Sequence, residues 1–172
     1  MADPLGQAGS SGRHRLLDLL PGFKGYRERE ERRQADKLLR DHLVGLIDGE
    51  RSKLQHAEAD LSRAGKVAQV GTLDRSVGQL TKWRDKLHYA DYGYTGWLER
   101  PPINEPELDK LYQYDASLQD AITALGEKVA AVTTADEAGF DAAVAALDAA
   151  ITDLGGKIEG RADVLAWLAP SQ

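Results

Sequence analysis

The sequence from Tyr26 to Gly65 contains no proline, and its apolar residues recur at spacings of three and four. Such spacing places apolar side chains on one face of an α-helix. The members of this stripe are Ala35, Leu39, Leu43, Leu46, Leu54, Ala57, Leu61 and Ala64. We therefore predict one long helix, with a bend near Gly49 as an alternative and Gly65 as its C-terminal stop.

Three further stripes of this kind follow along the chain. They predict helices over about Lys66–Ala90 and Glu105–Val132, and a fourth helix after Thr133-Thr134. The apolar stripe of this fourth helix includes Phe140 and continues to Leu168, with a kink predicted at Gly155-Gly156. The connections near Gly65 and Thr133 are short, which favours antiparallel neighbours. The predicted fold is therefore all-α: an antiparallel three- or four-helix bundle, similar to a coiled coil.

The N-terminal residues differ from the rest in composition. Residues 1–14 are mostly small and polar, so we predict a disordered tail over 1–14 and a single helical bundle domain over 15–172. We find neither a signal-peptide pattern nor an apolar run of about 18 residues. The chain has no cysteine, which excludes disulfides and thiolate chemistry. We expect a cytoplasmic protein, with peripheral association at a membrane surface as an alternative.

Charge is distributed unevenly along the chain. Residues 1–98 hold 17 Lys and Arg against 14 Asp and Glu, whereas residues 99–172 hold 5 against 14. The net charge is −6, which argues against a protein that coats nucleic acid, because such affinity depends on cations that neutralise phosphates.

No motif of an enzyme or of a metal or nucleotide site is present. The sequence lacks phosphate-binding glycine loops and a serine-hydrolase elbow. Its closest approach to a metal-ligand pair is Asp85 with His88, which is more typical of a surface hydrogen bond than of a di-metal bundle. We therefore predict no catalytic residue, no metal and no cofactor, and we leave a small-molecule ligand open.

The segment Asp91–Pro106 interrupts the helical pattern with glycine, proline and aromatic residues. Tyrosine and tryptophan are common in binding hot spots because they combine a large apolar surface with a polar group. The candidates for partner binding are Tyr89, just before this segment, and Tyr92, Tyr94 and Trp97 within it. The alternative is that these rings close the end of the bundle.

Basic residues concentrate at the start of the first long helix, and a short apolar segment precedes them. The basic candidates for partner binding are Lys24, Arg27, Arg29, Arg32 and Arg33. Pairs such as Asp36 with Arg40 instead fit a solvated helix face. The apolar segment, read as one or two helical turns, either folds back onto the bundle or anchors a partner or an anionic membrane through Leu16, Leu17, Leu19, Leu20 and Phe23.

Two charged residues interrupt the apolar stripes. Asp115 takes an inward position of the third predicted helix and Arg84 one of the second. A buried carboxylate needs a partner, so we expect Asp115 to pair with Arg84 or with a tyrosine hydroxyl. A polar pocket around Asp115 would instead indicate a small ligand-binding bundle.

The runs Pro21–Tyr26 and Ala90–Tyr94 resemble segments of small bacterial helical proteins, and this resemblance implies no activity. Ile158–Arg161 matches the cleavage motif of the protease factor Xa, but the apolar stripe continues through it, so we treat it as part of the helix. Together these features predict a non-enzymatic interaction or scaffold protein that binds a protein partner or itself. A protein at the membrane surface is the first alternative.

Overall fold

The computed structural model describes residues 6–26, 29–90 and 104–168. These residues form five helices and no strand: α1 (Gly6–Leu19), α2 (Arg29–Arg63), α3 (Val67–His88), α5 (Glu105–Thr134) and α6 (Phe140–Leu168). The prediction of an all-α bundle is confirmed.

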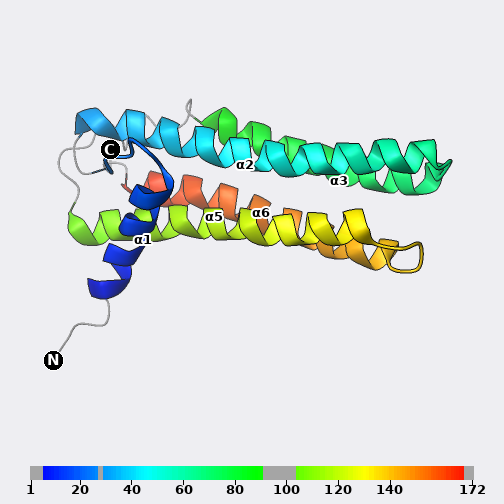
Figure 1. Ribbon diagram of the computed structural model, residues 1–172. Helices are drawn as coiled ribbons and strands as arrows, with labels where there is room; N and C mark the ends of the chain where they lie inside the picture. Colours follow the sequence, from blue (N-terminus) through cyan, green and yellow to red (C-terminus); the bar gives the residue numbers. More distant parts are fainter. Residues whose placement is uncertain (1–5, 27–28, 91–103, 169–172) are drawn as a thin grey trace.

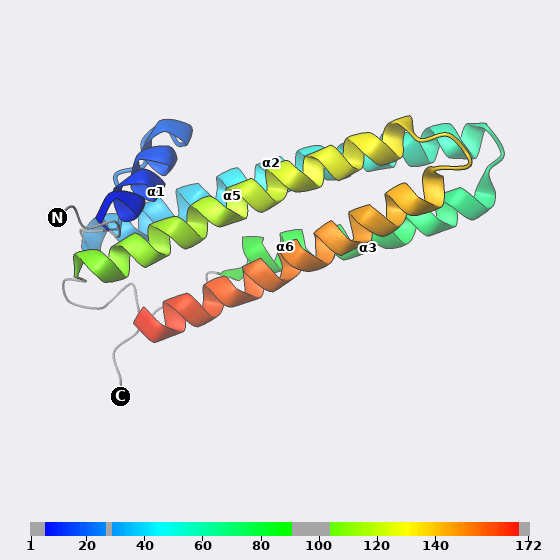
Figure 2. The same cartoon turned by 90° about the horizontal axis from the view of Figure 1, so that it is seen from below.

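The four long helices form two antiparallel hairpins, α2 with α3 and α5 with α6 (Figure 1). The hairpins pack side by side, with α2 against α5 and α3 against α6. Helices α3 and α5 therefore lie diagonally opposite each other. The prediction left three or four helices open, and the structure has four in the bundle, with α1 crossing the outside of α5 (Figure 2).

The core follows most of the predicted stripes, but Ala64 is exposed and Ile47 rather than Leu46 is fully buried in α2. Leu39, Leu43 and Leu54 of α2 are fully buried, as are Leu147, Ile151 and Leu154 of α6. Helix α2 is continuous through Gly49 and α6 through Gly155-Gly156, because i to i+4 hydrogen bonds tolerate glycine in a helix that tertiary packing supports. Neither helix is interrupted at its glycine, and the predicted bend at Gly49 and kink at Gly155-Gly156 stay predictions.

The helix ends have clear chemical causes. Gly65 has a φ of 75°, the left-handed conformation that glycine adopts readily, and it ends α2. At the start of α5, the Asn104 side chain accepts a hydrogen bond from the Glu107 backbone N–H at 3.0 Å, and the Asn104 backbone N–H donates to Glu107 Oε2 at 3.4 Å. This capping box fixes where α5 begins.

Helix α1 is longer than the one or two turns predicted. It begins at Gly6, so it includes residues 6–14 of the stretch predicted as a disordered tail. Its apolar side packs on α5, and Arg15 forms an ion pair with Asp120 of that helix. Tertiary contacts of this kind stabilise a helix that its small and polar residues would not favour alone.

Candidate functional site

A cluster of buried charged side chains lies where α2 and α5 begin and where α3 and α6 end. We call this half of the bundle the clamped end. Its centre is Arg161 of α6, whose Nε donates to Asp115 Oδ1 at 2.7 Å and whose Nη2 donates to Asp36 Oδ1 at 2.9 Å. All three side chains are at most 1% exposed. One guanidinium thus joins α6 to both α2 and α5.

Two tyrosines extend this cluster to the connection between α1 and α2. The Tyr26 hydroxyl donates to Asp115 Oδ2 at 2.7 Å, and the Tyr26 backbone N–H donates to the Tyr112 hydroxyl at 2.8 Å. The two rings stack with centroids 5.3 Å apart, and Phe23 meets both edge-on. These contacts attach the α1–α2 connection to α5.

Two arginines of α2 complete the network. Arg40 donates from Nε to Asp36 Oδ2 at 2.9 Å and from Nη1 to the His88 carbonyl at 3.0 Å, at the C-terminus of α3. Arg32 donates from Nε to the Tyr26 carbonyl at 2.7 Å. The network therefore reaches all four helices of the bundle.

Burial and charge shift the protonation equilibria of this cluster in opposite directions. Loss of water raises the pKa of Asp115, and the neighbouring Arg161 and Tyr26 partly oppose that rise. Burial, followed by the nearby Asp115 charge, holds the pKa of Tyr26 well above its ordinary value. Burial alone would lower the pKa of Arg161, but Asp115 and Asp36 raise it well above the usual range. Arg161 is therefore a permanent buried cation.

The network joins helices and leaves little polar capacity for a substrate. Both oxygens of Asp115 and both oxygens of Asp36 accept hydrogen bonds. Among the described residues, Arg161 Nη1 is the one buried side-chain atom of the network without a hydrogen-bond partner. A buried arginine that bridges two carboxylates fixes the relative positions of helices, which is the role that this geometry supports.

The two predicted inward charges have different surroundings. Asp115 is fully buried and pairs with Tyr26, one of the partner types expected, and with Arg161, which the sequence reasoning missed. The expected pairing with Arg84 is not formed. Arg84 lies on α3, diagonally opposite α5, and binds Asp48 and Asp85 at the edge of the bundle.

Some of the basic residues predicted to bind a partner are exposed, and others are buried. Lys24 and Arg33 are exposed, and Lys24 pairs with Glu31. Arg32 is instead fully buried, because it lies four residues before Asp36 on the inward side of α2. Arg27 lies outside the described residues, and Arg29 opens α2 without a described side chain. The pair of Asp36 with Arg40 exists, but it is in the core rather than on a solvated face.

The predicted apolar anchor is largely covered by the fold. Leu16, Leu20 and Phe23 are buried, Leu17 is partly buried, and Leu19 is 43% exposed. Of the two alternatives for this segment, the structure therefore shows the one in which it folds back onto the bundle.

Aromatic residues remain exposed at the clamped end. Tyr89, at the end of α3, is 60% exposed, whereas Tyr92, Tyr94 and Trp97 lie outside the described residues. Sequence reasoning missed Trp167 near the end of α6, which is 57% exposed and has the Lys110 ammonium 4.8 Å from its ring centroid.

No family model matches this sequence, and searches of curated proteins and of solved structures find no significant match. Over the described ranges, no helix has the length and apolar content needed to cross a membrane. In the same ranges, no three carboxylate or imidazole side chains are grouped so that they could hold a metal ion.

Proposed function

We propose that this protein is a non-enzymatic interaction or scaffold protein that binds a protein partner at the clamped end. One observation carries the proposal. Of the four large apolar side chains that are exposed in the described residues, Leu19, Tyr89 and Trp167 lie at the clamped end, and Val67 alone lies at the opposite end.

The chemistry of these side chains supports binding of a protein. Tyrosine and tryptophan provide large contact areas with few rotatable bonds, and they are enriched in binding hot spots. The same half of the molecule carries the cations Lys24, Arg33 and Lys110 and the exposed acids Asp41 and Asp163, so it offers charges of both signs to a protein partner. A second copy of this chain is one candidate partner, because the mildly basic residues 1–98 complement the acidic residues 99–172 in charge.

The buried network supports the same proposal because it makes the clamped end rigid. Arg161 and its partners hold the helices that carry Tyr89 and Trp167. A surface that is already ordered before binding loses less conformational entropy when a partner binds. The exposed aromatic residues therefore belong to a preorganised surface.

The two alternative functions have less support. Burial of Leu16, Leu20 and Phe23 leaves little of the apolar segment for a membrane. A ligand pocket at Asp115 would need polar groups that point into an open space, but both oxygens of Asp115 already accept hydrogen bonds.

The test is site-specific photo-crosslinking in cells of the source organism. A photoreactive benzoylphenylalanine replaces Tyr89 or Trp167 in two variants, and it replaces Val67 in a control that is exposed at the other end. We expect one recurrent adduct from positions 89 and 167 and none from position 67. An adduct with a second copy of this chain would identify self-association. Equal adducts at all three positions, or none at 89 and 167, would contradict the proposal.

A further inference from the structure

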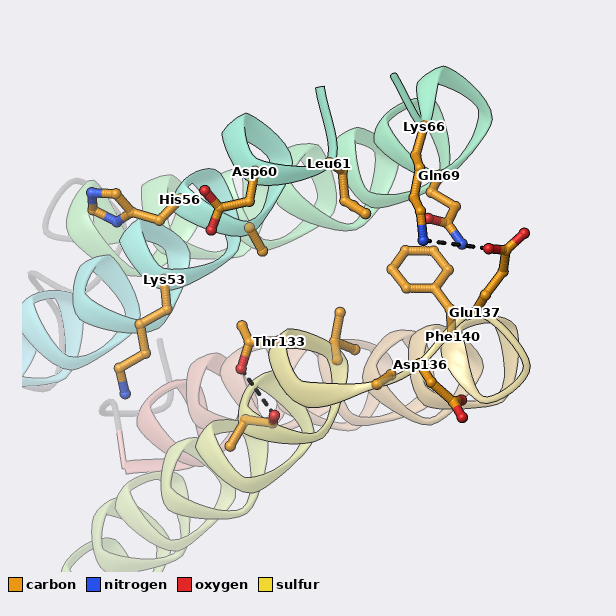
Figure 3. A pocket seen from close by; sticks show the side chains of 14 residues that line it. Lys53, His56, Asp60, Leu61, Lys66, Gln69, Thr133, Asp136, Glu137 and Phe140 are labelled. Carbon is orange, nitrogen blue, oxygen red and sulfur yellow. Dashed lines mark hydrogen bonds and ion pairs between the residues drawn. The ribbon is translucent and has the colours of Figure 1, made fainter. Parts of the chain in front are cut away.

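A pocket of about 560 Å³ lies at the opposite end of the bundle, between the two hairpin turns (Figure 3). We call this the tip pocket. Its volume is in the range of sites that bind small organic molecules. The apolar side chains that line it come from α2, α5, the α5–α6 turn and α6: Ala57, Leu61, Ala130, Val132, Ala135 and Phe140. The pocket can therefore receive an apolar group.

The apolar stripe of α2 is only partly covered at the tip pocket. Leu54 is fully buried, whereas Leu61, seven residues later on the same stripe, is partly buried. In Figure 3, the Leu61 side chain extends from α2 into the space between the hairpins. Removing apolar surface from water is favourable, so a ligand that covers Ala57 and Leu61 gains binding free energy if its own surface is apolar.

Both lysines that line the tip pocket have acidic partners. Lys53 donates to Glu50 at 2.8 Å. Lys66 lies 3.5 Å from Glu137, across the two turns, and Glu137 is itself one of the acids of the lining. An anionic ligand would have to compete with these acids, so the two lysines do not favour an anion.

The other two acids of the lining are also bound. Asp60 forms an ion pair with Arg63, and Asp136 accepts a hydrogen bond from the Gly139 backbone N–H at 2.8 Å. The helix ends favour neither sign of charge, because α2 and α5 end at this end of the bundle and α3 and α6 begin there. The partial charges at helix C-termini and N-termini are opposite and offset each other. The tip pocket therefore selects neither a cation nor an anion.

The rim of the tip pocket favours a small molecule over a protein. A protein interface has an apolar core with polar residues around it. Of the large apolar side chains that are exposed in the described ranges, only Val67 lies at this end. The rim instead carries the exposed charged residues Lys53, Asp60, Asp136 and Glu137. The apolar surface is thus inside the pocket, where a small ligand reaches it.

We propose that the tip pocket binds an uncharged small molecule with an apolar body. This body lies against Ala57, Leu61 and Phe140 in the space between the hairpins, and the ion pairs around it stay in place. The site is independent of the partner surface proposed above, because the two lie at opposite ends of the bundle.

The test uses three probes of similar shape and different charge: phenylbutanol, phenylbutylammonium and phenylpentanoate. Each is titrated into the full-length protein, and amide NMR shifts give both the affinity and the location. We expect the alcohol to bind at least about tenfold more tightly than either ion, because a charge without a partner at the site loses hydration on binding. We expect the shifts to be confined to residues of the tip pocket.

Two filling variants and two matched controls make the test specific. Ala57→Phe and Ala130→Phe place a ring in the pocket from α2 and from α5, and each should abolish binding of the alcohol. The controls Ala59→Phe and Ala124→Phe add the same ring at exposed positions of the same two helices and should leave the affinity unchanged. Circular dichroism reports whether each variant folds, and the two filling positions keep the test valid if one variant does not.

Three results would overturn the proposal. These are no shift of tip-pocket amides with the alcohol, an ion that binds as tightly as the alcohol, and unchanged affinity in a folded filling variant. A dimer that Ala57→Phe dissociates would also overturn it, because a second copy of the chain would then occupy the pocket. The crosslinking experiment at positions 89 and 167 does not depend on these results, so the two proposals can fail separately.

Discussion

Arg161 carries a positive charge into a part of the bundle that solvent does not reach. Its side chain is 1% exposed, and its charge is balanced by Asp36 and Asp115 on two other helices. Removing one partner of a buried ion pair leaves an uncompensated charge, which costs about 3–5 kcal/mol in typical proteins. The cluster therefore makes the arrangement of α2, α5 and α6 depend on single residues.

Replacement of Arg161 tests this dependence. We expect Arg161→Met to lower the free energy of unfolding by about 3–5 kcal/mol, because Asp115 and Asp36 both lose a charged donor. The matched control is Arg63→Met, since Arg63 forms an exposed ion pair with Asp60 and should contribute less than about 1 kcal/mol. Urea unfolding followed by circular dichroism measures both values. A similar decrease in the free energy of unfolding in the two variants would show that the buried network contributes no more to stability than a surface ion pair.

The Tyr26 hydroxyl makes stability depend on pH in the alkaline range. Its pKa is held well above 10.0 in the folded protein, whereas the unfolded chain releases this proton near that pH. The unfolded state therefore binds fewer protons above about pH 10, so the contribution of Tyr26 to stability is complete below pH 10 and is lost as the pH rises further.

An absorbance titration of tyrosinate tests this behaviour. The chain has six tyrosines, and burial raises the pKa of Tyr114 as well as that of Tyr26. We expect Tyr26 to ionise only when circular dichroism reports unfolding, and Tyr114 to ionise at a higher pH than an exposed tyrosine. Tyr26→Phe should remove part of that late absorbance step. Ionisation of all six tyrosines in one step while the protein remains folded would contradict this prediction.

At the scale of the helix, two adjacent glycines of α6 have opposite roles. A Cβ at Gly155 would overlap the indole ring of Trp83, which packs on α6 from α3. A Cβ at the next residue, Gly156, would meet no heavy atom within 4 Å. Gly155 therefore permits close packing of α3 on α6, whereas Gly156 contributes only backbone freedom.

Alanine substitution at these two positions should change stability in opposite directions. We expect Gly155→Ala to destabilise by about 1–3 kcal/mol through overpacking against Trp83. We expect Gly156→Ala to stabilise by up to about 1 kcal/mol, because alanine favours the helix. Thermal unfolding of the two variants beside the original protein gives the comparison. A shift of the same sign in both would mean that the packing of Trp83 on Gly155 is not tight.

The helices could be predicted because their apolar stripes are long and regular. Leu108, Leu111 and Leu118 repeat at heptad spacing and are buried, and Asp115 lies among them at an inward position. The start of α1 could not be predicted, because its contacts with α5 come from tertiary structure rather than from its own sequence.

Most of the buried network was missed, although the sequence contains a signal for it. Arg161 lies three residues after Ile158 and four before Leu165, both of which are buried, so it belongs to the core stripe of α6. Asp36 lies three residues before Leu39 in the same way. If charged residues are counted as members of the stripe, Asp36 and Arg161 are both predicted to lie in the core. That these two side chains pair with each other could not be predicted, because it depends on which helices are neighbours.

At the scale of the whole molecule, the two ends of the bundle differ in chemistry. The clamped end has a buried charge network beneath exposed aromatic residues, whereas the opposite end has an open pocket between the hairpin turns. The two ends therefore present different surfaces.

Arg161 is buried at the clamped end, where Asp36 and Asp115 bind its side chain. Cleavage by factor Xa is the most direct test of whether this side chain stays inaccessible. The residues Ile158–Arg161 match the motif of this protease, which must bind the arginine side chain to cut after it. We predict that the folded protein resists cleavage under conditions that fully cut the same motif in a flexible fusion linker. Asp115→Asn, which weakens the hold on Arg161, should be cut faster than the original protein. Cleavage of the original protein at the rate of the linker would contradict the account.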